Sequence, residues 1–228
     1  MGFFGRTGRE GAGRPLPRRG LKRLVLISAT HFWKLMGANL LFVFFSLPVI
    51  TLPAALCALN RVCLLIYREG NSLLWLDFWG EFRQSFLRSL LPGALFGAAV
   101  FTGYFLMSLG AANGAYPVWC MLFWSLGIAL TAGGLLWGAY FFALVPLLEL
   151  GNMGVLKDAF LLCMLRPGRA LLALLIMLGM AFTAAVLMPV FLFALLLFWF
   201  AALQMGVCCL VNGAADEFIL EPYARDHT

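Results

Sequence analysis

Charged residues are scarce in this sequence. Asp, Glu, Lys and Arg make up 11% of the 228 residues, whereas a typical soluble domain carries roughly 25%. Hydrophobic residues make up 63%. A chain with so little charge cannot cover its surface with polar groups, which excludes an ordinary soluble domain. The composition predicts an integral membrane protein whose outer surface faces lipid.

The residue types that carry most enzyme chemistry are also scarce. There are two histidines, His31 and His227, and the chain contains no metal-spaced cluster and no phosphate-binding glycine loop followed by lysine. The six cysteines form no C-x-x-C pair and lie inside apolar runs, where free cysteine behaves as a small hydrophobe. These are Cys57, Cys63, Cys120, Cys163, Cys208 and Cys209. The sequence therefore predicts no catalytic residues, no metal and no cofactor.

The basic residues gather at one end of the chain. Eight of the sixteen Lys and Arg lie in the first 34 residues, where Glu10 is the one acidic residue. Beside a membrane span such a cluster is typical of a cytoplasmic orientation signal that touches anionic lipid, rather than of nucleic-acid binding. We expect residues 1–30 to be a flexible cytoplasmic tail, 31–212 a transmembrane bundle and 213–228 a second cytoplasmic tail.

Six apolar runs account for the predicted bundle, and crossing a bilayer takes about 20 helical residues. The runs are His31–Leu47, Pro53–Tyr67, Leu90–Gly110, Val118–Leu148, Ala170–Met188 and Pro189–Val211. The turns at 48–53, 111–117 and 188–190 carry no charge, whereas the connections at 68–89 and 149–169 are basic. The positive-inside rule then predicts an all-α polytopic bundle of about six spans in three hairpins, with both termini in the cytoplasm.

The first two runs are short, and the segment between them is open to three interpretations. Pro48 and Pro53 each remove a backbone donor and disfavour helix in the preceding residue, with Thr51 between them. Residues 31–67 are then two spans, a re-entrant hairpin, or one kinked helix.

Two cytoplasmic segments are predicted to be short helices lying in the membrane interface. In residues 74–88 aromatic residues recur every four positions and face lipid or a partner, which makes this segment a candidate docking helix. Its aromatic residues are Trp75, Phe78, Trp79, Phe82 and Phe86. Residues 155–162 are the second such segment.

Polar residues near the expected inner face form the one candidate site. They are Asn60, Arg61, Glu149, Gln204 and Asn212. Arg61 and Glu149 either pair or act as independent interfacial charges. The G-x-x-x-G pairs Gly93/Gly97 and Gly134/Gly138 predict close helix contacts, either within the chain or in a homo-oligomer.

The block Ser46-Leu47-Pro48-Val49-Ile50-Thr51, followed by an Ala-rich helix and an aromatic segment, resembles the YesL family of bacterial membrane proteins of unknown function. The resemblance covers about residues 30–215, although Pro53 and the long basic tail are less typical of the family. It implies an accessory or regulatory role beside a carbohydrate importer, and it supplies no catalytic residues. The competing hypothesis is a small facilitator or substrate-binding protein that uses the Pro48–Pro53 helix break, with a water-filled cavity lined by Thr51, Asn60 and Arg61.

Overall fold

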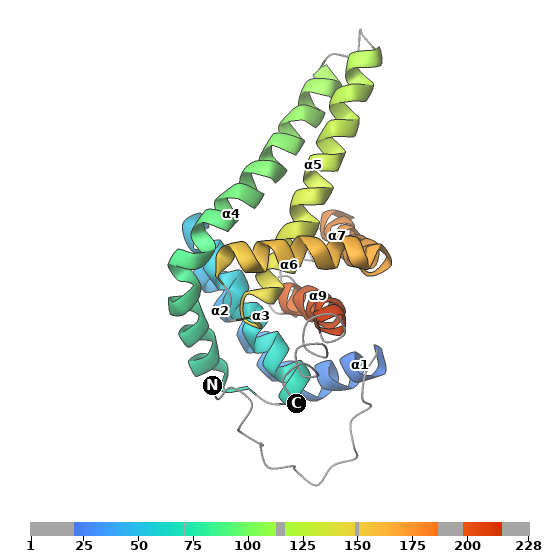
Figure 1. Cartoon of the computed structure of the whole chain (residues 1–228). Helices are drawn as coiled ribbons and strands as arrows, with labels where there is room; N and C mark the ends of the chain where they lie inside the picture. The colour runs from blue at the N-terminus through green and yellow to red at the C-terminus, as the bar shows by residue number, and fades with distance from the viewer. Residues whose placement is uncertain (1–20, 71, 113–116, 149–150, 187–197, 216–228) are drawn as a thin grey trace.

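The computed structural model describes residues 21–70, 72–112, 117–148, 151–186 and 198–215 (Figure 1). Within these ranges every regular element is helical. The elements are α1 Leu21–Thr30, α2 Phe32–Ser46, a 3-10 turn η1 Val49–Thr51, α3 Leu52–Glu69, α4 Leu74–Ala112, α5 Pro117–Leu144, α6 Asn152–Leu165, α7 Pro167–Val186 and α9 Phe200–Ala215. The predicted all-α class is confirmed.

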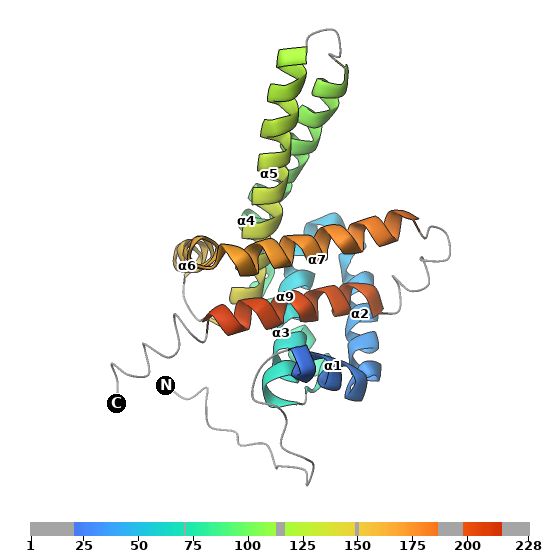
Figure 2. The same ribbon diagram turned by 90° about the vertical axis from the view of Figure 1, so that its right-hand side faces the viewer.

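The proline-rich break separates two helices that lie side by side (Figures 1 and 2). Helix α2 ends at Ser46, and α3 begins at Leu52 with Pro53 in its first turn, where a missing N–H has no cost. The Thr51 hydroxyl lies within hydrogen-bond reach of the carbonyl oxygens of Phe45 and Pro48. Residues 31–67 therefore form a helical hairpin and not one kinked helix.

Helix α4 runs through the boundary that the sequence analysis placed near residue 89. It is 39 residues long and includes Pro92, so it extends about 58 Å at 1.5 Å per residue. The expected interface helix at 74–88 and the third apolar run are one continuous helix. The separate short helix predicted there was wrong.

The distal half of α4 and most of α5 form a hairpin that projects beyond the other helices (Figures 1 and 2). We call Gly93–Ala112 and Pro117–Gly138 the arm. The remaining described helices and the first half of α4 form the helical block. Helices α7 and α9 lie next to each other and run across the direction of the arm (Figure 2).

Three single helices in the described residues are long and apolar enough to cross a membrane: Val49–Glu69, Leu74–Ala112 and Val118–Leu144. A fourth arises if the pair α6 and α7, bent by 99° at Arg166–Pro167, counts as one span. Helices Phe32–Ser46 and Phe200–Val211 are apolar but shorter. The six-span prediction is therefore not confirmed, and part of its sixth run, residues 189–197, lies outside the described residues.

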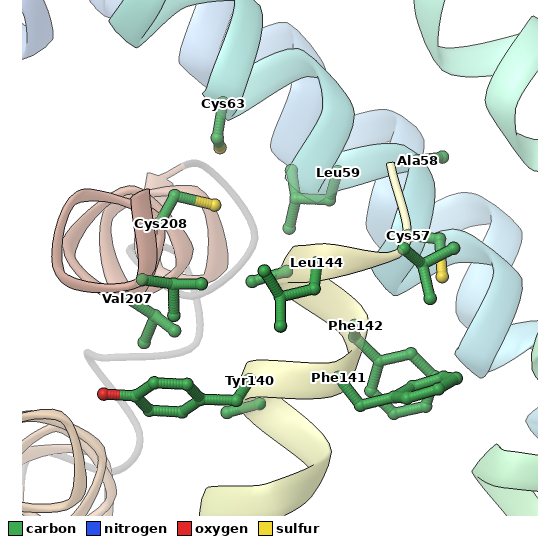
Figure 3. Packing of buried hydrophobic residues seen from close by; sticks show 14 of the residues in the cluster. Cys57, Ala58, Leu59, Cys63, Tyr140, Phe141, Phe142, Leu144, Val207 and Cys208 are labelled. Atoms are coloured by element: carbon green, nitrogen blue, oxygen red, sulfur yellow. The ribbon is translucent and has the colours of Figure 1, made fainter. Parts of the chain in front are cut away.

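The core of the block lies where α3, α5 and α9 meet (Figure 3). Cys57, Cys63 and Cys208 are free and fully buried among Leu59 and Leu144, as small apolar side chains. This packing fits the small-hydrophobe interpretation of the cysteines.

Candidate functional site

Two asparagines, Asn60 (buried) and Asn152 (partly buried), each donate to a carbonyl that a proline has left without a helical donor. Pro146 has no N–H for the Phe142 carbonyl four residues earlier, and Asn60 Nδ2 donates to that oxygen at 2.9 Å. In the same way Pro92 leaves the carbonyl of Arg88 to Asn152 Nδ2, at 2.8 Å. Freed backbone groups inside a membrane protein need such partners. The two asparagines thus stabilise helix irregularities.

The Asn152 contact explains why α4 continues through Pro92. The Arg88 Nε donates to Asn152 Oδ1 at 2.8 Å, while the Asn152 amide donates back to the Arg88 carbonyl. This paired contact joins the middle of α4 to the first residue of α6. It fixes the helix at the point where the proline would otherwise break it.

The candidate polar cluster does not form one site among the described residues. Arg61 Nη1 donates to the Pro146 carbonyl at 2.9 Å, and Cys208 Sγ lies 3.2 Å from Asn60 Oδ1. Gln204 lies one helical turn before Cys208 in α9 and lines a pocket instead. Glu149 and the side chain of Asn212 lie outside the described residues, so the Arg61–Glu149 pair stays a prediction.

The aromatic face of the candidate docking helix points inward. Phe78 is fully buried and Phe82 nearly so, because Phe45 of α2 packs against them at ring distances of 5.7 and 5.0 Å. Phe86 is partly buried against the same core. The expectation that these three phenylalanines face lipid or a partner was wrong. The four-residue repeat identified a common face but not its direction.

The outer face of the same segment carries the two tryptophans. Trp75 and Trp79 stack with ring centroids 6.1 Å apart, and Trp75 is 60% exposed with its neighbour Leu76 at 67%. Trp79 also touches Phe45. We call Leu73, Trp75, Leu76 and Trp79 the tryptophan patch.

The arm is held together by a seam of glycines. A Cβ on Gly103 would lie 2.7 Å from the Gly127 carbonyl oxygen, and one on Gly127 would lie 2.7 Å from the Gly103 carbonyl oxygen. Seven residues further along each helix, Gly110 packs on Trp124 and Gly134 on Ala99. Absence of side chains lets the two backbones approach closely.

The G-x-x-x-G pairs are used mainly inside the chain. A Cβ on Gly93 would collide with the Pro53 ring, and Gly134 and Gly138 face α4. Gly97 is different, since no atom lies within 4 Å of its would-be Cβ. It borders open space.

That open space is a pocket of about 620 Å³ at the base of the arm. Its walls come from α3, α4, α5, α7 and α9 and are almost entirely apolar. The pocket reaches the helix break at Leu52 and Pro53, but Thr51, Asn60 and Arg61 do not line it. This pocket is therefore not the polar cavity lined by Thr51, Asn60 and Arg61 that the competing hypothesis predicts.

Sequence reasoning missed most of the residues that line this pocket. Phe96, Phe101, Tyr104, Thr131 and Met177 are ordinary components of apolar helices. The available signal was the pairing of Gly97 with Gly134 and Gly138, because small residues on facing helices leave room for a ligand as well as for a backbone. Which of these glycines packs against the facing helix, and which borders open space, depends on how each helix is rotated about its own axis.

At the opposite end of the block, the start of α2 lies against the residues that follow α3. Gly70 ends α3 in the left-handed conformation, with φ +68°, and Lys34 Nζ donates to the Ser72 carbonyl at 3.2 Å. Partial burial and the nearby Lys34 lower the pKa of His31, although a hydrogen bond to the Gly70 backbone acts in the opposite direction.

These features define an all-helical protein with several apolar helices long enough to cross a membrane. The sequence profile of the family described as "Protein of unknown function, DUF624" matches residues 35–107. The matched stretch runs from α2 into the arm, and contains both the Pro48–Pro53 break and the tryptophan patch. No curated protein and no solved structure matches the chain. In the described residues no group of three or more His, Cys, Asp or Glu side chains is placed to hold a metal ion.

Proposed function

We propose that this is a bacterial cell-membrane protein without catalytic activity that serves as an accessory or regulatory partner of a carbohydrate importer. The matched family is the one to which YesL belongs, and the importer as partner comes from that resemblance. The observation that carries the docking role is the tryptophan patch, because it exposes large apolar side chains on a charged stretch of helix.

Charge placement supports a membrane layer around the arm. Residues 89–148 contain no Asp, Glu, Lys or Arg, whereas Asp77, Glu81, Arg83 and Arg88 fall within the first half of α4. A charged side chain at the bilayer centre costs about 2.5–3.5 kcal/mol on insertion scales. The arm then crosses the hydrocarbon layer as a hairpin. The first half of α4 lies on the cytoplasmic side with both chain termini, as the positive-inside rule also favours.

On that placement the tryptophan patch lies outside the hydrocarbon layer. Contiguous apolar surface exposed to water marks a site of interaction, and Trp is among the residues enriched in binding hot spots. Arg83 lies one turn further along the helix and is exposed. An aromatic pair beside a cation is the composition expected of a surface that another protein covers.

The test is crosslinking of the tagged full-length protein in native membranes, followed by identification of the captured proteins by mass spectrometry. Importer permease or solute-binding subunits should be recovered at near-stoichiometric levels. The double variant Trp75→Ser, Leu76→Ser should reduce their recovery about tenfold or more, since hot-spot truncations cost at least about 2 kcal/mol. The matched control is Met153→Ser, an equally exposed apolar residue on α6.

Two results would overturn this proposal. Recovery of the protein alone would replace an importer partner with self-association. Equal recovery of importer subunits by the double variant and the control would remove the docking role from the tryptophan patch.

A second function is favoured by the pocket at the base of the arm. It touches Pro53, as a substrate-binding protein built on the helix break requires. Its walls favour a largely apolar ligand.

A further inference from the structure

The pocket at the base of the arm contains one deeply buried polar side chain. Gln204 of α9 is 5% exposed and lines the wall. Its amide makes no hydrogen bond within the described part of the chain. The buried amide of Asn39 differs, because its Oδ1 accepts a hydrogen bond from the Ala201 N–H at 3.0 Å. An amide in apolar surroundings is costly unless it is paired.

The other polar groups of the pocket do not satisfy Gln204. Thr131 Oγ1 donates to the carbonyl of Gly127 in its own helix, at 2.8 Å. Tyr104 lies on the exposed side of the arm. Gln204 therefore presents both a donor and an acceptor to an otherwise apolar space.

The pocket is elongated along the arm. It follows α4 from Gly93 to Tyr104, which is 11 residues and about 16 Å. Its volume of about 620 Å³ falls within the range of about 300–1,000 Å³ that ligand sites occupy. A space of this length with apolar walls can hold a single hydrocarbon chain.

We propose that this pocket binds one single-chain amphiphile from the inner leaflet, with its hydrocarbon chain along α4 and its polar group hydrogen-bonded to the Gln204 amide. The inference rests on the membrane placement of the arm proposed above. On that placement Gln204 lies at the block end, toward the cytoplasmic interface, and the chain points along the arm into the hydrocarbon layer. This is the orientation of an inner-leaflet lipid, with the polar group at the interface.

Two glycines that border open space provide a test variant and a control variant for binding in the pocket. No atom lies within 4 Å of a Cβ built on Gly97, so a side chain there has space to enter the pocket, and Gly97→Leu also introduces a better helix former. Gly133 is equally open and lies in α5 of the same arm, but it does not line the pocket. Gly133→Leu is therefore the matched control. Gln204→Leu removes the polar group while keeping an apolar wall.

The experiment uses palmitic acid that carries a diazirine on its chain, added to the full-length protein in phosphatidylglycerol nanodiscs. Labelling should saturate, should be displaced by unlabelled palmitic acid and should map to pocket residues such as Met177. Gly97→Leu should reduce it about tenfold, and Gly133→Leu should leave it unchanged. Gln204→Leu should weaken it about fivefold, as expected for one net hydrogen bond.

A second readout separates a ligand-binding role for Gln204 from a structural one. Without added palmitic acid, Gln204→Leu should raise the unfolding temperature, because it removes an unpaired amide from apolar surroundings. A purely structural glutamine would predict a decrease.

Labelling that does not saturate and is equal in Gly97→Leu and wild type would come from palmitic acid in the bulk lipid. That result would overturn binding in the pocket. Unchanged affinity in Gln204→Leu, or a lowered unfolding temperature, would overturn the assignment of the polar group. Since these variants leave the tryptophan patch intact, a failure here is distinguishable from a failure of importer recovery.

Discussion

The arm and the helical block solve the same problem in different ways. Both bring apolar helices together, but the block buries polar side chains, whereas the described residues of the arm bury none. In the block, Asn60 and Asn152 donate to carbonyls that Pro146 and Pro92 leave open. In the arm, Gly103 and Gly127 bring two backbones into contact.

The difference shows where these helices tolerate a proline. Pro92 and Pro146 are accommodated because an asparagine from another helix reaches the freed carbonyl. Where such a partner is missing, close contact needs small residues and regular helix. Substitutions should therefore act on the block through burial and hydrogen bonds, and on the arm through steric fit.

The largest contrast is expected between a buried and an outward-facing phenylalanine. Phe78→Ala in the block should lower the free energy of unfolding by about 3–5 kcal/mol, the usual cost for a buried Phe. Phe101→Ala in the arm should change it by less than about 0.5 kcal/mol, because Phe101 is 70% exposed. Unfolding in mixed micelles with increasing SDS measures both. Equal effects would show that Phe101 packs against another molecule.

A second contrast tests the proline and asparagine contact. Asn60→Leu should cost about 2–3 kcal/mol, since it removes a hydrogen bond and leaves the buried Phe142 carbonyl unpaired. The same unfolding measurement applies.

The decisive control for Asn60 is a double-mutant cycle with Pro146→Ala. An alanine restores the N–H that the Phe142 carbonyl lacks, so Asn60→Leu should cost less in the Pro146→Ala background. A coupling free energy of about 1 kcal/mol is expected for residues that share one partner. Strict additivity of the two substitutions would contradict the interpretation.

A smaller effect is expected in the glycine seam of the arm. Gly103→Ala should lower stability by about 1–2 kcal/mol, because the methyl group meets the Gly127 backbone. The cost is moderated by the better helix propensity of alanine. Gly97→Ala is the control and should stabilise the arm slightly. If Gly103→Ala were as stable as Gly97→Ala, the close approach would be wrong.

The sequence predicted the helical class and the break at Pro48–Pro53, because both depend on local properties of the chain. It did not predict that α4 passes through Pro92, since the compensating donor, Asn152, lies 60 residues further along. It also placed the Phe78 and Phe82 face outward, although the period of a helix shows only which residues share a face. The prediction of one polar cluster failed for a related reason. Asn60 contacts Cys208, and Gln204 lies one helical turn before Cys208 in α9, but Gln204 lines the pocket and Asn60 does not.

The smallest expected effect concerns His31, which lies in the block between α1 and α2. Its pKa in the folded protein is lowered from the ordinary value of 6.5, chiefly by burial and then by Lys34, so the unfolded chain binds this proton more readily than the folded chain does. The contribution of His31 to the free energy of unfolding is therefore largest above pH 6.5. It decreases as the pH falls from 6.5 toward the lowered pKa, and it is constant below that pKa. Because the arm has no titratable counterpart among Asp, Glu, Lys, Arg and His, this pH dependence belongs to the block alone. His31→Gln should reduce the change in unfolding temperature between pH 7 and pH 5 relative to wild type. The carboxylates are the same in both proteins, so their contribution cancels in this comparison. An unchanged slope would assign the pH dependence to other groups.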